Sequence, residues 1–371
     1  MMATKDHIVF TGVQKSYDGD SLVVKDLNLN IRGGEFLTML GPSGSGKTTC
    51  LMMLAGFETL THGEIYINGE GISRIPPHER NIGMVFQNYA LFPHFTVAEN
   101  LAFPLQVRKL PPTDIAKKVA RALDMVQLGD FGKRRPGQLS GGQQQRVAVA
   151  RALVFEPSLV LMDEPLGALD KNLREQMQFE LKHLHERIGV TFVYVTHDQS
   201  EALTMSDRIA VFDNGIIQQL DSAEDLYEKP QNAFVAGFIG ENNALTGKIT
   251  ARGKDGFCTV AAGKDAAQKV NALNIADAKA GETTTLSLRP ERVFLGDGKN
   301  INAGNAGGGI NRFDGCVQEC IYMGDHIRIR LSLLDNDEFI VKVANDRKHR
   351  ELTTGNTIPL YWLAEDCRAL N

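Results

Sequence analysis

The chain has 371 residues, with 40 basic and 45 acidic side chains and a formal net charge of −5. This length predicts about two or three domains, and the slightly acidic balance argues against a mainly electrostatic attraction to nucleic acid or anionic lipid. Five scattered cysteines are too few to stabilise a chain of this length by disulfide bonds. We therefore expect the protein to lie in a reducing compartment and to contain no disulfides.

No apolar run approaches the roughly 20 residues that a membrane-spanning helix needs. Residues 1–10 also lack the basic-then-apolar pattern of a signal peptide. We therefore expect a cytosolic protein that touches membranes only through partner proteins.

The N-terminal segment alternates short apolar runs with turn residues, a pattern typical of strands. Its last run, residues 36–40, stops abruptly at Gly41. Residues 48–55 contain good helix formers and end at Gly56. The pattern predicts a strand, a glycine loop and a short helix in succession.

Helical periodicity then dominates residues 97–127. Pro111-Pro112 interrupts it, and Thr113-Asp114 offers capping side chains for a second helix over residues 115–126. We interpret this region as a helical insertion, which extends over about residues 88–157.

Two later runs, residues 158–162 and 190–196, are short, apolar and rich in β-branched side chains, as expected of buried strands. Strands that alternate with helices predict a mostly parallel sheet. On the intervening helix, His183 and His185 are two residues apart and face different ways, so we expect both at the solvated surface. The apolar positions of that helix are Leu173, Met177, Leu181, Leu184 and Ile188.

Beyond about residue 236 the helical pattern fades and alternating strands appear. Ile327, Ile329 and Leu331 are predicted to face inward, with charged or polar neighbours facing outward. We predict an α/β domain with a phosphate-binding loop and a helical insertion over residues 1–240. A β-rich domain follows over residues 241–371.

Residues 41–48, Gly-Pro-Ser-Gly-Ser-Gly-Lys-Thr, fit the phosphate-binding loop pattern and lie between a predicted strand and helix, as this motif requires. Glycines let successive backbone N–H groups converge on a phosphate, and the helix N-terminus adds its positive dipole end. We expect Lys47 to reach the β and γ oxygens of a nucleoside triphosphate and Thr48 to offer a hydroxyl to Mg²⁺. A glycine-rich hairpin turn is the alternative. The candidate binding residues are Ser43, Gly44, Ser45, Gly46, Lys47, Thr48 and Thr49.

The apolar run at residues 159–162 ends in two adjacent carboxylates. Successive strand residues face opposite ways, so the strand end can aim Asp163 at the metal, through water, while Glu164 meets the attacking water. An ordinary acidic strand end is the alternative. Together with the loop, the pair predicts hydrolysis of a nucleoside triphosphate.

The pentapeptide Leu-Ser-Gly-Gly-Gln at residues 139–143 resembles the signature of ABC-transporter ATPases, and both nucleotide motifs accompany it. Physically it is a second anion site: Ser140 offers a hydroxyl, Gly141 and Gly142 open the backbone, and a helix that starts near Gln143 directs its positive end outward. The resemblance extends over residues 5–240.

The resemblance implies that the chain binds ATP and Mg²⁺ and works as a homodimer. Each signature would complete the phosphate loop of the other copy, where charge develops on the γ-phosphate. It further implies an importer subunit at the cytoplasmic face of the inner membrane, with two transmembrane permease subunits and a solute-binding protein as partners. No nucleic-acid partner is expected.

Other positions match family motifs one by one. Tyr17 matches the aromatic on which adenine stacks, and a core or hairpin tyrosine is the alternative. Gln87 matches the residue that senses Mg²⁺ and water, His197 the switch histidine beside Glu164, and Asp170 the loop that contacts the partner subunit. A turn glutamine and a packing histidine are the plainer interpretations. Many relatives carry Ser where this chain has Gly167. This chain therefore has no side chain at that position to make a contact.

Residues 287–291 and the surrounding strands resemble the accessory β-barrel domain of such importers, which is related to oligonucleotide-binding folds. With residues 234–240, this domain most resembles polyamine (spermidine/putrescine) importers. Ferric iron, sugar and other small solutes are alternatives. A soluble ABC ATPase acting on DNA or the ribosome is an alternative of another class. A kinase would share the phosphate loop but leaves residues 139–143 unexplained.

Overall fold

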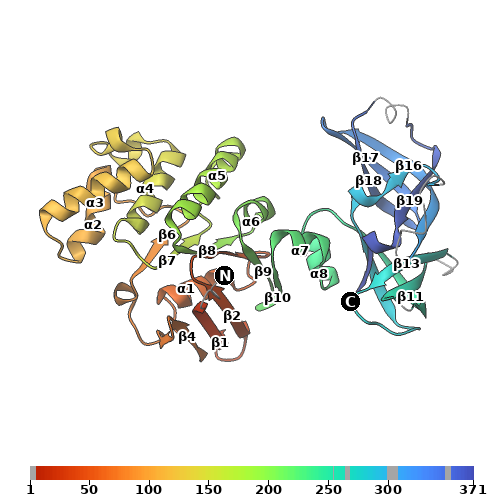
Figure 1. The fold of residues 1–371 in the computed structure, drawn as a ribbon, viewed down its shortest axis with the longest axis horizontal. Helices are drawn as coiled ribbons and strands as arrows, with labels where there is room; N and C mark the ends of the chain where they lie inside the picture. Colours follow the sequence, from red (N-terminus) through yellow and green to blue (C-terminus); the bar gives the residue numbers. More distant parts are fainter. Residues whose placement is uncertain (1–5, 254, 264–267, 299–307, 347–351) are drawn as a thin grey trace. The chain divides into compact units, whose positions relative to one another are not determined.

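The computed structural model describes residues 6–253, 255–263, 268–298, 308–346 and 352–371, and the chain divides into two units, Met1–Asp225 and Leu226–Asn371 (Figure 1). The expected boundary was residue 240. The structure groups residues 226–240 with the second unit instead. An internal network of that unit, described below, accounts for this grouping.

The centre of the first unit is a six-stranded sheet in the order β10-β9-β3-β8-β7-β6. All neighbours run parallel except β10 and β9, which confirms the predicted, mostly parallel sheet. Strands β3 and β8 are buried along their whole length, which explains their continuous apolar and β-branched sequences. The strands are β3 (Phe36–Leu40), β6 (Ile82–Val85), β7 (Leu159–Asp163), β8 (Thr191–Thr196), β9 (Arg208–Asp213) and β10 (Ile216–Asp221).

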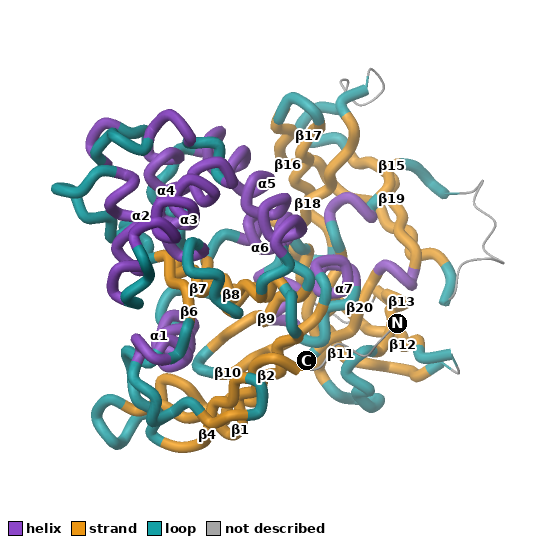
Figure 2. Tube along the Cα trace, turned by 60° about the vertical axis from the view of Figure 1, so that its left-hand side comes forward, coloured by secondary structure: helices purple, strands orange, loops and turns teal. Residues whose placement is uncertain are grey.

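A smaller antiparallel sheet, in the order β2-β1-β4-β5, lies on one side of the main sheet, with helix α1 (Lys47–Ala55) at the same side (Figures 1 and 2). Leu51 and Leu54 of α1 join one buried cluster with Ile8 of β1 and Leu161 of β7. Helix α1 is thereby fixed between the two sheets. The strands are β1 (Asp6–Ser16), β2 (Leu22–Arg32), β4 (His62–Ile67) and β5 (Glu70–Gly71).

Helices cover the opposite side of the main sheet (Figures 1 and 2). Helix α5 (Lys171–Ile188) packs on the sheet through residues such as Met177 and Leu181. His185 is buried against Phe36 and Phe192, so its expected position at the surface was wrong, whereas His183 is exposed. Helix α6 (Gln199–Met205) follows β8.

The helical insertion has its own buried cluster. A capping box between Thr96 and Glu99 starts its first helix. The second begins at Pro112 with Pro111 as the N-cap, so the expected caps at Thr113-Asp114 were wrong. Proline suits the first helical position because its missing N–H would have no partner there. The helices are α2 (Val97–Val107), α3 (Pro112–Met125) and α4 (Gly141–Leu153).

The second unit contains a closed barrel in the order β11-β12-β13-β20-β14 and a five-stranded sheet in the order β15-β19-β16-β17-β18. Burial alternates along β17, which confirms the predicted inward positions Ile327, Ile329 and Leu331. The strands are β11 (Asn243–Arg252), β12 (Phe257–Ala262), β13 (Gln268–Asn274), β14 (Thr283–Leu288), β15 (Phe294–Leu295), β16 (Ile310–Tyr322), β17 (His326–Leu333), β18 (Asn336–Ala344), β19 (Thr357–Leu363) and β20 (Cys367–Leu370).

Arg289 ties the segment before the barrel to the barrel itself. Helix α7 (Ala223–Glu228) and helix α8 (Ala233–Phe238) form this segment. The buried guanidinium donates to the carbonyl oxygens of Ala236, Ile239 and Glu241 at 2.6–3.1 Å and to that of Tyr227 at 3.0 Å. These bonds hold residues 227–241 against β14, which is why this stretch belongs to the second unit.

We predict that Arg289→Met lowers the free energy of unfolding of the second unit by about 3 kcal/mol, because buried carbonyl oxygens lose their donor. Urea unfolding can be followed by the fluorescence of Trp362, the single tryptophan, which is fully buried in this unit. The control Arg252→Met removes an exposed ion pair with Asp277 and should cost about 1 kcal/mol or less. Equal midpoints for the two variants would contradict the anchoring role.

Candidate functional site

The loop between β3 and α1 needs glycine at particular positions. A methyl group at Gly41 would lie 2.3 Å from the Phe212 carbonyl oxygen, and Gly44 and Gly46 have φ values of 80° and 99°. A residue with a Cβ atom would clash at the first position and would be strained by the positive φ at the other two. The loop therefore curves tightly into the N-terminus of α1 and leaves Ser43 and Gly44 exposed, with Ser45 and Gly46 buried behind them.

Lys47 is held by this loop at the start of α1. Its Nζ donates to the carbonyl oxygens of Gly41 at 2.9 Å and Pro42 at 2.8 Å. Burial lowers the pKa of the ammonium, and the carboxylates of Glu164 and Asp163 oppose that shift. A buried ammonium beside a helix N-terminus is a strong attractor for phosphate oxygens.

Thr48 and Asp163 meet across the gap between α1 and β7. The Thr48 hydroxyl donates to Asp163 Oδ1 at 3.1 Å. Burial raises the pKa of Asp163, while the bond from Thr48 lowers it. A hydroxyl and a carboxylate are hard oxygen ligands, and Mg²⁺ takes few of these from protein because it keeps several waters. This donor pair fits Mg²⁺. Thr49 lies half-buried on the same helical turn.

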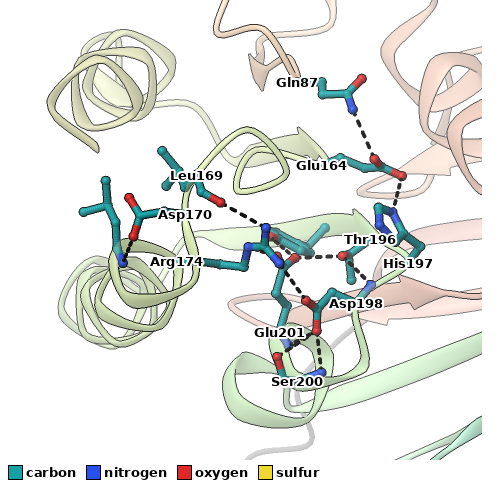
Figure 3. A network of polar contacts seen from close by, with 12 residues as sticks. Gln87, Glu164, Leu169, Asp170, Arg174, Thr196, His197, Asp198, Ser200 and Glu201 are labelled. Atoms are coloured by element: carbon teal, nitrogen blue, oxygen red, sulfur yellow. Dashed lines mark hydrogen bonds and ion pairs between the residues drawn. The ribbon is translucent and has the colours of Figure 1, made fainter. Parts of the chain in front are cut away.

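Glu164 joins two side chains that come from neighbouring strand ends (Figure 3). Its Oε2 accepts a hydrogen bond from Gln87 Nε2 at 3.3 Å, and its Oε1 lies 3.1 Å from His197 Nδ1. Gln87 follows β6, Glu164 follows β7 and His197 follows β8. Ligands of open parallel sheets bind at this carboxyl edge of the strands. The structure thus brings all three predicted residues together.

The signature residues lie at the N-terminus of α4. Ser140 is the N-cap: its Oγ accepts from the backbone N–H of Gln143 at 3.3 Å, and Gln143 Oε1 accepts from the Ser140 backbone N–H at 3.0 Å. The helix begins at Gly141, two residues before the expected start near Gln143, because this reciprocal capping box fixes it there. Methyl groups at Gly141 and Gly142 would each lie 3.0 Å from a leucine methyl carbon.

Helices α4 and α1 lie on opposite sides of the main sheet in both views (Figures 1 and 2). The signature at the start of α4 and the phosphate loop at the start of α1 are therefore two separate surfaces of one chain. Nothing in the described residues joins them by a hydrogen bond or ion pair.

Tyr17 and Asp170 lie outside the glutamate cluster. Tyr17 is 60% exposed, and the ammonium of Lys15 lies 4.7 Å from its ring centroid. An open, cation-backed ring of this kind is able to stack on a flat base. The Asp170 carboxylate caps α5 by accepting from the Leu173 N–H at 3.0 Å. At Gly167 a methyl group would lie 3.8 Å from Gln87 Nε2, so this position adjoins the glutamate cluster.

Sequence reasoning missed a polar network directly behind the glutamate cluster (Figure 3). Arg174 of α5 donates to Asp198 Oδ2 at 3.2 Å, and Asp198 caps α6. Glu201 accepts hydrogen bonds from Thr196 Oγ1 and from the Tyr194 hydroxyl, each at 2.7 Å. The sequence does carry one signal, because an aspartate followed by serine and glutamate before an apolar turn is typical of a helix start.

The phosphate loop, the aspartate that pairs with Thr48 and the glutamate at the strand edge define a P-loop nucleoside-triphosphatase. The ABC transporter family profile matches residues 24–167, and the TOBE domain profile matches residues 286–370. None of the helices in the described part of the chain combines the length and apolarity of a membrane span.

Curated relatives cover nearly the whole chain. The spermidine/putrescine import ATP-binding protein PotA of Thermobifida fusca (strain YX) is 46% identical over 357 residues, 95% of this chain and 90% of the relative. The uncharacterized ABC transporter ATP-binding protein YdcT of Escherichia coli (strain K12) is 42% identical over 358 residues, 96% of this chain and 95% of the relative. This chain belongs to the family of ABC-transporter ATP-binding proteins and is an ABC-type ATPase.

Among solved structures, the chain is similar to the dimeric, post-hydrolysis ATP-binding cassette MJ0796 bound to ADP and Pi. The sequence identity is 36% and the TM-score 0.52, and the match covers 58% of this chain and 98% of that one. This similarity and the TOBE match confirm the predicted fold class, an α/β P-loop domain followed by a β-rich domain.

Proposed function

We propose that this ABC-type ATPase binds Mg-ATP between two copies of itself and energises the uptake of polyamines by a membrane importer. The observation that carries the proposal is the placement of Glu164 between Gln87 and His197, at the same strand edge as Thr48 and Asp163. Hydrolysis of a triphosphate needs a cradle, a metal and a positioned water. Each requirement has matching residues here.

Within one copy, the amides of the loop around Gly44 and Gly46 and the Lys47 ammonium hold the β- and γ-phosphates. Thr48, Asp163 and Gln87 hold Mg²⁺, which neutralises phosphate charge when bound. Ser43, Ser45 and Thr49 complete the loop's contacts, and Tyr17 stacks on adenine.

Glu164 is the group that accepts a proton from the attacking water. His197 holds the Glu164 carboxylate by contacting Oε1, and its ring is exposed. The exposed ring would contact the γ-phosphate of bound ATP. Gln87 contacts the other carboxylate oxygen and orients the water. Opposite contacts on the two oxygens fix the plane of the carboxylate, which is the condition for efficient proton transfer.

The signature serves the nucleotide of the second copy. Ser140, Gly141, Gly142 and Gln143 form a positively polarised helix start, with Ser140 exposed and Gly142 buried, on the other side of the sheet from α1. In a two-fold dimer this surface meets the partner's phosphate loop, and two equivalent sites result. Asp170, at the start of α5 beside the signature, faces the same interface. The similar cassette MJ0796 is dimeric, which supports the proposal of a dimer.

The importer would comprise two such subunits at the cytoplasmic face of the inner membrane, two transmembrane permease subunits and a solute-binding protein. Polyamine as the solute rests on relatives such as PotA of Thermobifida fusca (strain YX). Ferric iron, sugar or another small solute is the second candidate, since one relative, YdcT, has no named solute. A soluble ABC ATPase acting on DNA or ribosomes has no supporting observation in this chain.

Glu164→Gln should retain ATP binding and accumulate as an ATP-bound dimer, with turnover reduced by about 10²-fold or more because the proton acceptor is lost. Phosphate release measures turnover, and light scattering after gel filtration measures the dimer. The matched control Glu79→Gln changes an exposed carboxylate elsewhere in this unit and should behave like the parent. Parental turnover in Glu164→Gln would remove Glu164 from the mechanism.

Ser140→Arg should keep binding of a fluorescent ATP analogue, because the signature is not part of the phosphate loop's own surface. Turnover should fall by about 10²-fold or more, since a bulky cation replaces the group that faces the partner's γ-phosphate. Asp130→Arg, which adds an exposed charge in the same insertion, is the control. Undiminished hydrolysis by Ser140→Arg would contradict the trans arrangement.

The solute assignment is tested with a complex reconstituted in vesicles from this chain and the permease and binding-protein subunits that purify with it. Spermidine or putrescine should raise ATP turnover several-fold, while ferric iron and maltose should not. Stimulation by iron or sugar alone would replace the polyamine assignment and leave the ATPase assignment intact. Purification of the chain with ribosomes or DNA instead of membrane subunits would end the transport proposal.

A further inference from the structure

Arg174, in the first turn of α5, connects two loops that flank the glutamate cluster (Figure 3). Its Nη2 donates to the carbonyl oxygen of Leu169 at 3.0 Å, and its Nη1 donates to Asp198 Oδ2 at 3.2 Å. Leu169 belongs to the loop that follows Glu164, and Asp198 follows His197 directly. One planar guanidinium therefore spans the two chain segments that carry the predicted base and the predicted switch histidine.

The Asp198 side of this contact is rigid. Asp198 Oδ1 accepts from the Ser200 backbone N–H at 2.8 Å, so one carboxylate oxygen caps α6 and the other receives Arg174. The Asp198 backbone N–H donates to Thr196 Oγ1 at 3.0 Å, at the end of β8. Although burial raises it, hydrogen bonds from Ser200, Glu201 and Arg174 hold the pKa of Asp198 below its usual value.

Glu201 adds a second acidic group behind Arg174. Its side chain is almost fully buried, and its Oε1 lies 3.9 Å from Arg174 Nε. At this distance the two groups form an ion pair but no hydrogen bond. The other oxygen of Glu201 accepts from Tyr194 and Thr196 of β8. The guanidinium is thus held by charges that are themselves fixed to the sheet.

The loop that contains Leu169 contacts both Glu164 and the signature. The Gly167 N–H donates to the Glu164 carbonyl oxygen at 3.2 Å, which closes the turn between the base and Leu169. A methyl group at Gly141 would lie 3.0 Å from Leu169 Cδ2, so the side chain of Leu169 packs directly under the signature. Fixing the Leu169 carbonyl fixes the loop that lies between these two functional segments.

We propose that Arg174 is a positioning residue that clamps the loop at residues 166–170 to the loop at residues 197–198 and so keeps His197 in register with Glu164. The inference rests on the roles proposed above for these two residues. Arginine suits the task because its two Nη groups donate in separate directions from one rigid plane. A lysine has one nitrogen at the end of a flexible stem and cannot reproduce both bonds with that geometry.

Arg174→Lys tests this clamp, because it keeps the positive charge beside Asp198 and Glu201. We expect kcat for ATP hydrolysis to fall by about 10- to 100-fold, as for a misplacement of reacting groups by about 1 Å. KM for ATP and the affinity for a fluorescent ATP analogue should stay within about threefold, because the phosphate loop is untouched. A kcat within twofold of the parent, or a change confined to KM, would overturn the proposal.

Arg187→Lys is the matched control. Arg187 lies on the same helix and donates from Nη2 to a carbonyl oxygen, that of Met125, at 2.8 Å. Its replacement changes the same chemical group in the same helix away from the glutamate cluster. It should leave kcat and KM unchanged, and an equal loss in both variants would show that replacing either arginine of α5 impairs turnover, which would overturn a specific role of Arg174 in positioning His197.

A His197→Ala background separates positioning from general stability. If Arg174 acts through His197, Arg174→Lys should lower the residual turnover of His197→Ala by less than about threefold, because groups that act as a unit are non-additive. The same fractional loss in both backgrounds would overturn the proposal. Parental turnover in both His197→Ala and Glu164→Gln would instead refute the proposed function itself.

If Arg174→Lys does not fold, Asp198→Asn provides the second variant. An asparagine keeps an oxygen to cap α6 but presents an amide where Oδ2 accepted from Arg174. The variant should fold, as judged by its circular dichroism, and show the same loss in kcat with an unchanged KM. Parental kcat in folded Asp198→Asn would overturn the clamp.

Discussion

The arrangement of the site depends on the backbone turn at Glu164. This residue has a φ of 44°, in the left-handed region, and its N–H donates to the Val195 carbonyl oxygen of β8 at 3.0 Å. Such a conformation costs a non-glycine residue about 1–3 kcal/mol and persists only where the surrounding structure enforces it. Here it separates two adjacent carboxylates, since Asp163 reaches Thr48 while Glu164 reaches Gln87 and His197.

The parallel sheet places the side chain that this turn presents next to side chains from the neighbouring strands. Strands β6, β7 and β8 are neighbours, so their carboxyl ends place three polar side chains side by side although these residues lie far apart in sequence. Burial of the strands by both layers fixes the strand ends, and the polar residues just beyond inherit that rigidity. Precision at the site is therefore a property of the buried sheet, although Gln87, Glu164 and His197 lie just beyond its strands.

Much of this was predictable from sequence because it depends on local pattern. The phosphate loop, the strand ends at Asp163 and His197, and the alternation along β17 each follow from neighbouring residues. Contacts set by tertiary packing were not predictable. Helical spacing placed His185 at the surface, yet it packs on Phe36 of a distant strand. Arg174 carries no motif of its own, and only folding brings Asp198 to it.

In the proposed dimer, the loop at residues 166–170 would connect the two nucleotide sites to which one chain contributes. The loop leaves Glu164 on one side and supports Gly141 through Leu169 on the other. Close-packed side chains do not deform continuously, so a displacement of the loop at one end must alter the other. In the proposed dimer, a nucleotide contacted by Glu164 and His197 of one copy would share a short, packed connection with the signature proposed to serve the partner's nucleotide. Hydrolysis at the two sites could be independent only if this loop moved freely. The hydrogen bonds at Gly167, Leu169 and Asp170 restrict its movement.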